Sequence, residues 1–562
     1  MLRKSIILTV FLMMASTHAV AKEISVTQYG AWPSDGKDDA AALRHAVDAC
    51  GEGDRLVFAK GTYDLFASFE IKNKTGLDIN GNGSTLLLRG FDRTRGWPVF
   101  SAIRLLSSRQ VTIHDFVIDM DVSPNSAGEI VNVGDRYFDV RVFDEFPVTG
   151  EEYVDHVMTF YRNGLPNGKN MDLYKLDGGL PVEKVSGRVL RIGMHRRFDL
   201  DKGEYVCLYH KVYGGVCIYF GDSDLCTLRD VTVHSFPGMG FYSTDRSTNI
   251  TVERYRVERP RGTARLTSTN ADGSKYVHTG GKLTIKDCYY EGMGDDAINI
   301  HSSYGKVVKR DGKTLSIARI RRGKEVDVSA RYVLQGDTVE FYDGKTMVPK
   351  GTAKVLERDG QRMTLDVVPG RVAVGDLFNN ISMTPKVRIS GVQVHRNRAR
   401  GFLLQSQDVI VEQCTIFNPT GIGIFVTMDV NYWFESGQGK DVILRNNTIV
   451  GANKHLLREG AITVKCGHDS GGTDYPAGVH RNIKILNNTI RDTMNSGIYA
   501  CSTDGIEIRG NTIEHASQKP SLANGNYAIY LKNCTNGIAK GNTVLFSDRV
   551  FGKENCKRME VD

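Results

Sequence analysis

The phrase Asn-Asn-Thr-Ile at residues 446–449 recurs, with small variations, at 487–490, 510–513 and 541–544. Each copy follows a run that alternates β-branched residues with others, as in Ile483-Lys484-Ile485-Leu486. Such alternation is typical of a short strand with one buried face. A strand followed by an asparagine turn, repeated along the chain, predicts a solenoid. Stacked coils of this kind bury a continuous core, and inward asparagines can form hydrogen-bonded ladders at the turns.

Weaker copies of the same unit extend the pattern toward the N-terminus, at residues 111–113, 226–231, 283–288 and 387–390. Where nothing intervenes, the repeat is about two dozen residues long, which suits three short strands per coil. We therefore predict an all-β protein, a right-handed parallel β-helix that occupies most of the chain.

Two stretches, at about 124–216 and 304–385, do not follow the sequence repeat of the coils. The second carries Asp-Gly turns between alternating strands, at 311–312, 343–344 and 359–360, which is typical of hairpins. We predict that each stretch is an inserted antiparallel β subdomain beside the functional site. The coils then occupy 22–123, 217–303 and 386–562. An amphipathic helix that ends near Cys50 is expected to cap the N-terminal end of the solenoid.

Residues 1–21 resemble a secretory signal peptide. Arg3 and Lys4 precede an apolar run, and the small residues Ala19 and Ala21 form a cleavage pattern. The apolar run is too short to span a bilayer. We therefore expect a protein that is secreted or periplasmic and has no membrane span.

Composition bears on partners and on metal ions. A formal charge of +7 on 562 residues is a small excess, and no basic cluster is interleaved with aromatic residues, so a nucleic-acid partner is not expected. The ten cysteines include no CxxC pair, and no His/Cys group has the spacing of a zinc site. We expect buried thiols, with one or two disulfides left open.

Three aspartates carry the functional prediction. The segment Thr269-Asn270-Ala271-Asp272-Gly273 is followed one coil later by Met293-Gly294-Asp295-Asp296-Ala297, so stacking should gather all three carboxylates on one face. Carboxylates this close together raise one another's pKa by like-charge repulsion, which is energetically unfavourable. A catalytic function is the simplest reason for a protein to keep such an arrangement. Inverting glycosidases pair an acid and a base roughly 6.5–9.5 Å apart, and one coil step is about 4.8 Å. A retaining site, and a turn or calcium site, stay open.

The same residues carry a family resemblance. An Asn-x-Asp-Gly turn followed by Gly-Asp-Asp-Ala-Ile-Asn-Ile-His at 294–301 resembles the polygalacturonases, whose three-aspartate inverting site has this order. The fuller context at 270–278 and 292–301 is similar to glycoside hydrolase family 110, secreted α-1,3-galactosidases of gut and marine bacteria that include blood group B-cleaving enzymes. The resemblance covers nearly the whole mature chain and is specific at the aspartates.

This resemblance implies an exo-α-galactosidase, without cofactor or metal, that removes terminal α-1,3-linked galactose from glycans, with inversion. The family's catalytic aspartates fall on Asp272, Asp295 and Asp296. The polygalacturonase analogy would make Asp295 the acid and the other two the base pair, although both assignments satisfy the geometry. The chain lacks the downstream Gly-His-Gly and Arg-Ile-Lys phrases of polygalacturonases, which favours a neutral sugar.

Further polar and aromatic residues are candidates for substrate binding because they lie in or beside the predicted coil strands and loops: Arg246, His278, Asn299, His301, Trp433, Glu459 and Lys465. Taken singly, each polar residue could instead be a satisfied structural group. Exposed aromatics such as Trp433 commonly stack on sugar faces. Loop packing, or a contact between the subunits of a homodimer, is an alternative for Trp433.

Two other functions stay open at this stage. One is a β-helix hydrolase or lyase that acts on a pectic or sulfated polysaccharide. The other is a carbohydrate-binding or adhesive β-helix without turnover. The sequence does not distinguish branched from linear galactose acceptors.

Overall fold

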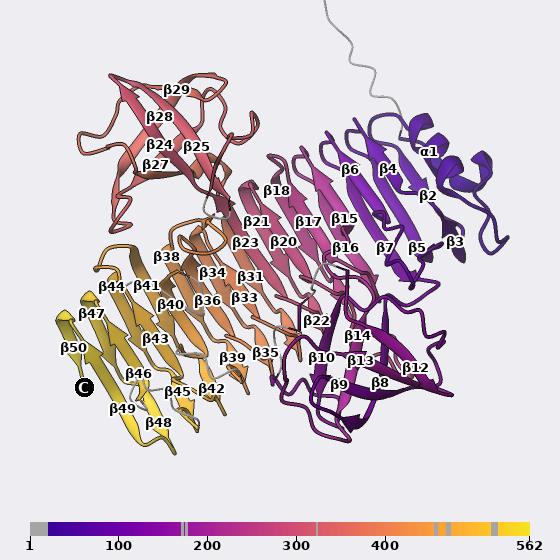
Figure 1. Cartoon of the computed structure of the whole chain (residues 1–562). Coiled ribbons are helices and arrows are strands. Elements are labelled where there is room, and N and C mark those ends of the chain that lie inside the picture. The colour runs from indigo at the N-terminus through magenta and orange to yellow at the C-terminus, as the bar shows by residue number, and fades with distance from the viewer. Residues whose placement is uncertain are drawn as a thin grey trace, which may run out of the picture.

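The computed structural model describes residues 21–169, 173–174, 178–321, 324–454, 459–467, 474–518 and 527–562. The predicted signal peptide therefore lies, except for its last residue, outside the described residues. Figure 1 shows the strands stacked in chain order along one axis, from indigo to yellow, with two further sheets set beside the stack.

The prediction of a parallel β-helix is confirmed. Each coil contributes three strands, for example β34 (Gln407–Glu412), β35 (Thr415–Phe417) and β36 (Ile424–Met428). Over the described ranges these strands build two long sheets, of 23 and 13 strands. The 23-stranded sheet runs from β1 (Glu23–Ser25) to β50 (Lys557–Val561), and the 13-stranded sheet from β4 (Phe69–Lys72) to β49 (Arg549–Glu554). Inward side chains from both sheets form one continuous apolar core.

The repeated asparagines form the predicted ladder. The side-chain amide of Asn447 donates to Asn488 at 3.0 Å, that of Asn488 to Asn511 at 3.0 Å, and that of Asn511 to Asn542 at 2.9 Å. Each amide also donates to a backbone carbonyl of the preceding coil, as Asn488 does to Leu444. The turns between coils are therefore hydrogen-bonded from one coil to the next, which fixes the stacking register.

The N-terminal end of the helix is capped as expected. Helix α1 (Ala40–Ala49) lies at the N-terminal end of the stack (Figure 1), and its residues Leu43 and Val47 are buried. Asp38 accepts hydrogen bonds from the backbone of Ala40 and Phe66, and Asp39 accepts one from Asp64. This aspartate pair is therefore part of the cap rather than of a site.

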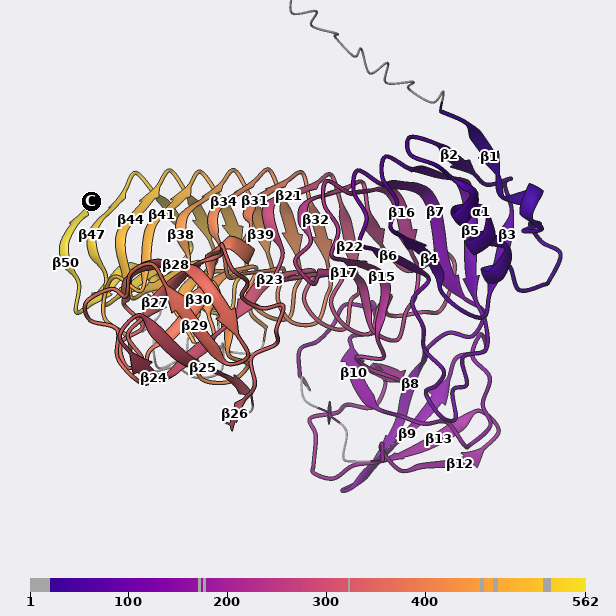
Figure 2. The same ribbon diagram turned by 90° about the horizontal axis from the view of Figure 1, so that it is seen from above.

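Two antiparallel sheets of seven strands are inserted between coils and project from the helix (Figure 2). The first insert runs from β8 (Asn125–Val133) to β14 (Tyr205–Tyr209), and the second from β24 (Gly305–Asp311) to β30 (Leu377–Asn380). Each has its own apolar core. The exact domain boundaries given above stay predictions.

All ten cysteines lie among the described residues as free thiols, and nine of them are buried. In the part of the chain that the structure describes, no helix is both long and apolar enough to cross a membrane.

Candidate active site

The register of two neighbouring strands brings the three aspartates together. Strand β20 (Ser274–Val277) pairs in parallel with β23 (Ile298–Ser303), with Ser274 opposite Ile298. Asp272 and Asp296 each lie two residues before this pair, so they occupy equivalent positions in adjacent coils. Asp296 donates its backbone N–H to Asp272 Oδ1 at 3.3 Å. One carboxylate oxygen from each of Asp272, Asp295 and Asp296 lies within 4.8 Å of the others. The arrangement expected from the one-coil spacing is therefore present.

Asp295 is the most exposed of the three carboxylates, and both of its oxygens have a neighbour. The hydroxyl of Tyr213 donates to Oδ2, and Nη1 of Arg398 lies 3.7 Å from Oδ1. Tyr213 comes from the segment that returns from the first insert, and Arg398 from the coil after Asp295. Asp295 is thus held at the mouth of the cluster from two separate parts of the chain.

Asp296 is fully buried beside Arg400. Its Oδ1 accepts the backbone N–H of Arg400 at 2.9 Å and lies 3.2 Å from the guanidinium Nε. Its Oδ2 accepts a longer hydrogen bond, of 3.4 Å, from the amide of Asn299. The carbonyl Oδ1 of Asn299 is buried and has no hydrogen-bond partner among the described residues. Because buried polar atoms are normally paired, this oxygen is suited to accept a bond from a ligand.

Asp272 begins a buried series of alternating charges. Lys275 Nζ lies 3.6 Å from Asp272 and 3.7 Å from Glu435, and Glu435 Oε1 in turn lies 3.2 Å from His301 Nε2. Glu435 belongs to β37 (Glu435–Ser436), which pairs antiparallel with the end of β23. The loop after β36 therefore folds back past β33 (Phe402–Leu404), which lies between β36 and β23 in the sheet, and brings Glu435 to the site.

Burial governs the protonation of the cluster. It raises the pKa of Asp272 to about 7, against the opposing effect of Lys275. Burial also raises the pKa of Asp296 well above its ordinary value, although Arg400 opposes the rise and Asp295 adds to it. Three carboxylates at this separation cannot all be ionised at low cost. The cluster as a whole therefore keeps a proton near neutral pH, and because the carboxyl groups are coupled, that proton belongs to the cluster rather than to one aspartate.

The series beyond Asp272 has the opposite character. Burial alone would lower the pKa of Lys275, but Glu435 and Asp272 outweigh it and raise that pKa. Burial would raise the pKa of Glu435, but His301 and Lys275 outweigh it and lower the pKa to about 2. Burial lowers the pKa of His301 itself to about 4. At neutral pH, Lys275 is a buried cation, Glu435 a buried anion and His301 a neutral imidazole.

The other predicted binding residues fall into two groups. Asn299 contacts Asp296 of the cluster, whereas His301 contacts Glu435 at the end of the series that begins at Asp272. His278 and Arg246 instead face the second insert: the ring of His278 lies 5.2 Å from that of Tyr332, and the guanidinium of Arg246 makes two hydrogen bonds, of 2.8 and 2.9 Å, to Asp337. The geometry gives Arg246 a structural task, since it joins the helix to that insert, and its predicted role in substrate binding gains no support.

Glu459, Lys465 and Trp433 lie on the C-terminal side of the aspartates. Lys465 and Glu459 form a buried ion pair of 2.5 Å. Trp433 is 56% exposed, and Asp429 holds its loop by accepting three consecutive backbone N–H groups at 2.9–3.0 Å. Trp433 shares a small pocket with Arg400, Gln405, Phe425 and Glu435, so its indole lies beside the charged cluster.

Five residues at the site were not anticipated as functional from the sequence: Tyr213, Lys275, Arg398, Arg400 and Glu435. Lys275 lies inside the motif that identified Asp272. The two arginines lie one coil beyond the aspartate pair once the second insert is removed, because Ile298 pairs with Phe402. The coil spacing in the sequence could therefore have predicted the positions of both arginines. Tyr213 and Glu435 reach the site from an insert and a loop, and no repeat pattern places them there.

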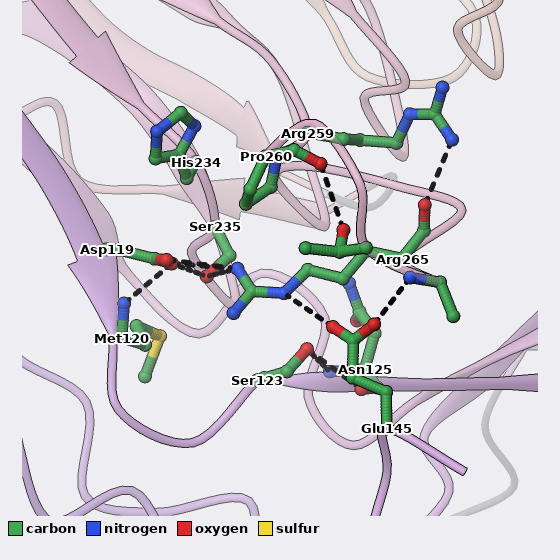
Figure 3. A network of polar contacts seen from close by, with 12 residues as sticks. Asp119, Met120, Ser123, Asn125, Glu145, His234, Ser235, Arg259, Pro260 and Arg265 are labelled. Carbon is green, nitrogen blue, oxygen red and sulfur yellow. Dashed lines mark hydrogen bonds and ion pairs between the residues drawn. The ribbon is translucent and has the colours of Figure 1, made fainter. Parts of the chain in front are cut away.

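The segment that leads into Asp272 is fastened to the first insert. Arg265 lies between two carboxylates (Figure 3): Nη1 donates to Asp119 at 2.9 Å, and Nε lies 3.9 Å from Glu145 of the insert. The neighbouring Leu266 is buried in the core of the insert. The first insert therefore braces the chain just before a predicted catalytic residue.

The donor set can be tested against a metal ion. Three carboxylate oxygens within 4.8 Å of one another could contact a cation, and oxygen ligands suit calcium. However, Lys275, Arg398 and Arg400 already lie 3.2–3.7 Å from these carboxylates. Three positive groups at this distance oppose a divalent ion, so the cluster suits proton transfer better.

Comparison with known proteins agrees with this geometry. No family model matches the chain. Alpha-1,3-galactosidase A of Bacteroides fragilis is 24% identical over 608 residues, which cover 98% of this chain and 97% of that protein. Alpha-1,3-galactosidase B of Akkermansia muciniphila is 25% identical and covers 95% of this chain and 71% of that protein. The chain is a glycoside hydrolase.

A solved structure supports the architecture of this glycoside hydrolase. The crystal structure of the Agl-KA catalytic domain matches with a TM-score of 0.50 at 13% identity, over 96% of this chain and 68% of that one. At this identity the similarity concerns the fold alone. For the hydrolase, the closest oxygens of the aspartates are nearer than the roughly 6.5–9.5 Å between the carboxyl groups of most inverting enzymes, so the distance alone does not predict inversion.

Proposed function

We propose that the protein is an exo-acting α-galactosidase that hydrolyses terminal α-1,3-linked galactose, with inversion and without a metal ion. The observation that carries the proposal is the buried cluster of Asp272, Asp295 and Asp296 in a chain that is similar along 98% of its length to a protein named alpha-1,3-galactosidase A. Inversion rests on the resemblance to three-aspartate enzymes rather than on the carboxylate separation.

In the proposed mechanism Asp295 is the acid, since it is the aspartate at the mouth of the cluster. It protonates the glycosidic oxygen as the bond to the aglycone breaks. Asp272 and Asp296 hold a water molecule and accept its proton as the water attacks the anomeric carbon. Arg400 and Lys275 favour the ionised forms of Asp296 and Asp272, which opposes part of the rise in pKa that burial causes.

The neighbouring polar groups are proposed to bind galactose hydroxyls. Asn299 offers its unpartnered carbonyl, His301 is a neutral imidazole, and Lys465 with Glu459 borders the site. Trp433 is proposed to stack on a sugar face. The loop that carries it runs from β36 back to pair with the end of β23, and it is proposed to block the extension of a polymer along that side. Such a barrier favours recognition of a chain end.

The proposed substrate is therefore a glycan with terminal α-galactose, which the protein would meet outside the cytoplasm. The secreted or periplasmic location and a homodimer contact through Trp433 remain predictions.

A linkage panel tests the proposal. Purified protein is incubated in excess EDTA with Galα1-3Gal, Galα1-4Gal, Galα1-6Gal, the branched blood group B trisaccharide and digalacturonate, and free sugar is measured by chromatography. We expect galactose release from the α-1,3 substrates, at least about tenfold faster than from the other linkages. Release of galacturonate, or of an unsaturated product only after metal is restored, would instead indicate the polysaccharide hydrolase or lyase. Binding without product would indicate an adhesin.

A further inference from the structure

Tyr213 lies in a short segment that is held rigidly between the first insert and the helix. The segment follows β14 and leads into β15 (Val216–Gly221). Just before it, His210 is buried, with Nδ1 2.8 Å from the carbonyl of Tyr153 and Nε2 2.7 Å from Ser126. The backbone N–H of Val212 donates to Asp155 at 2.8 Å. The position of Tyr213 is therefore set by the insert.

The backbone of Tyr213 adopts a conformation that a tyrosine rarely takes. Its φ is 51°, in the left-handed region where a side chain with a Cβ is disfavoured. The residue that follows is a glycine, Gly214, whose N–H donates to the carbonyl of Pro237 at 2.9 Å. This turn, together with the hydrogen bond of Gly214, sets the direction in which the side chain of Tyr213 leaves the segment.

The phenol of Tyr213 points at the catalytic cluster. Its hydroxyl donates to Asp295 Oδ2, while about half of the residue stays exposed at the mouth of the site. The same segment contacts the other catalytic coil, because the amide of Asn270 donates to the carbonyl of Lys211 at 2.6 Å. One segment of the insert therefore contacts Asp295 directly and the turn that carries Asp272.

The two contacts have a geometric consequence for Asp295. The phenol of Tyr213 holds Oδ2, and Nη1 of Arg398 lies 3.7 Å from Oδ1. Because each carboxyl oxygen has its own neighbour, the rotation of the carboxyl group is fixed, and the group that donates the proton is presented to the substrate in one orientation.

We propose that Tyr213 is a positioning residue that orients Asp295 for proton donation, so that the first insert takes part in catalysis. The proposal rests on the proposed glycosidase function of the aspartates. Under this proposal the first insert orients a catalytic residue, in addition to lying beside the site and packing against the β-helix.

The test is Tyr213→Phe, which keeps the ring and removes only the hydroxyl. On Galα1-3Gal we expect kcat to fall about 10- to 100-fold, with KM within about twofold of wild type. On 2,4-dinitrophenyl α-galactoside, whose leaving group needs little protonation, the deficit should shrink to less than about threefold. A purely structural role would not produce this difference between substrates. Tyr161→Phe, an equally exposed tyrosine of the same insert, serves as the matched control and should match wild type on both.

Several outcomes would overturn the proposal. Wild-type kcat in Tyr213→Phe, or an equal loss on both substrates, would show that the phenol does not orient the acid. A raised KM with unchanged kcat would show that Tyr213 binds substrate instead. Wild-type protein that cleaves no glycoside would contradict the proposed function and this inference together, whereas an active wild type with an unaffected variant would contradict this inference alone.

Discussion

Asp295→Asn is expected to lower kcat on Galα1-3Gal by about 10³- to 10⁴-fold, because an amide cannot supply the proton that the departing sugar needs. The fold should survive, since Asp295 is the least buried of the three aspartates and asparagine is nearly the same size. On 2,4-dinitrophenyl α-galactoside the loss should be far smaller, because that leaving group departs without a proton. Initial rates on the two substrates, with the thermal midpoint as a check of folding, measure the effect.

Asp296→Asn is the matched variant for this experiment. It removes the base rather than the acid, so both substrates should lose about the same factor, again on the order of 10³ or more. If Asp296→Asn is rescued by the activated leaving group and Asp295→Asn is not, the two roles are exchanged. If neither substitution lowers the rate on either substrate, the aspartate cluster is not the catalytic site.

Lys275→Met is expected to have a large effect outside the three aspartates, because it removes the cation whose Nζ lies 3.6 Å from Asp272 and 3.7 Å from Glu435. Both carboxylates become harder to ionise. Asp272, whose pKa is about 7 with Lys275 present, should then titrate at a higher pH. Because the proposed base must be ionised, the acidic limb of the kcat/KM profile should move to higher pH, and the rate at pH 6 should fall by about 100-fold or more.

Removal of one member of a buried ion pair also destabilises the fold, here by about 3 kcal/mol in the free energy of unfolding. Urea unfolding measures this loss, and pH–rate profiles above and below pH 7 measure the shift. Lys282→Met, at an exposed position on the next strand along the chain, β21 (Gly280–Lys286), is the control and should change neither quantity. An unshifted acidic limb in Lys275→Met would show that Lys275 does not act on the base.

Most of the fold could be predicted from the sequence, because the repeats show which residues of successive coils lie opposite one another. The asparagine turns at 447, 488, 511 and 542 and the one-coil spacing of Asp272 and Asp296 both translate directly into stacked positions. The two segments that contain Asp272 and Asp296 could therefore be placed side by side from their spacing alone. Residues that obey the coil rhythm were predictable in this way.

Residues that reach the site across an insert were not. Arg400 lies 104 positions from Asp296 although it occupies the next coil, because the second insert intervenes. Tyr213 lies 82 positions before Asp295 and arrives on the return from the first insert. Arg246 illustrates the converse: it lies at a coil strand end, as predicted, yet Asp337 of the second insert binds its guanidinium. Such contacts depend on how an insert docks, which local patterns do not encode.

The most direct measurement is proton NMR of galactose released early from Galα1-3Gal by the wild-type protein in excess EDTA. Water that attacks the face opposite the leaving group yields the β-anomer first, and mutarotation then forms the α-anomer slowly. Early β-galactose is the result that we predict for an inverting, metal-independent three-aspartate site. Early α-galactose would contradict inversion, and the absence of any galactose would contradict the proposed hydrolysis itself.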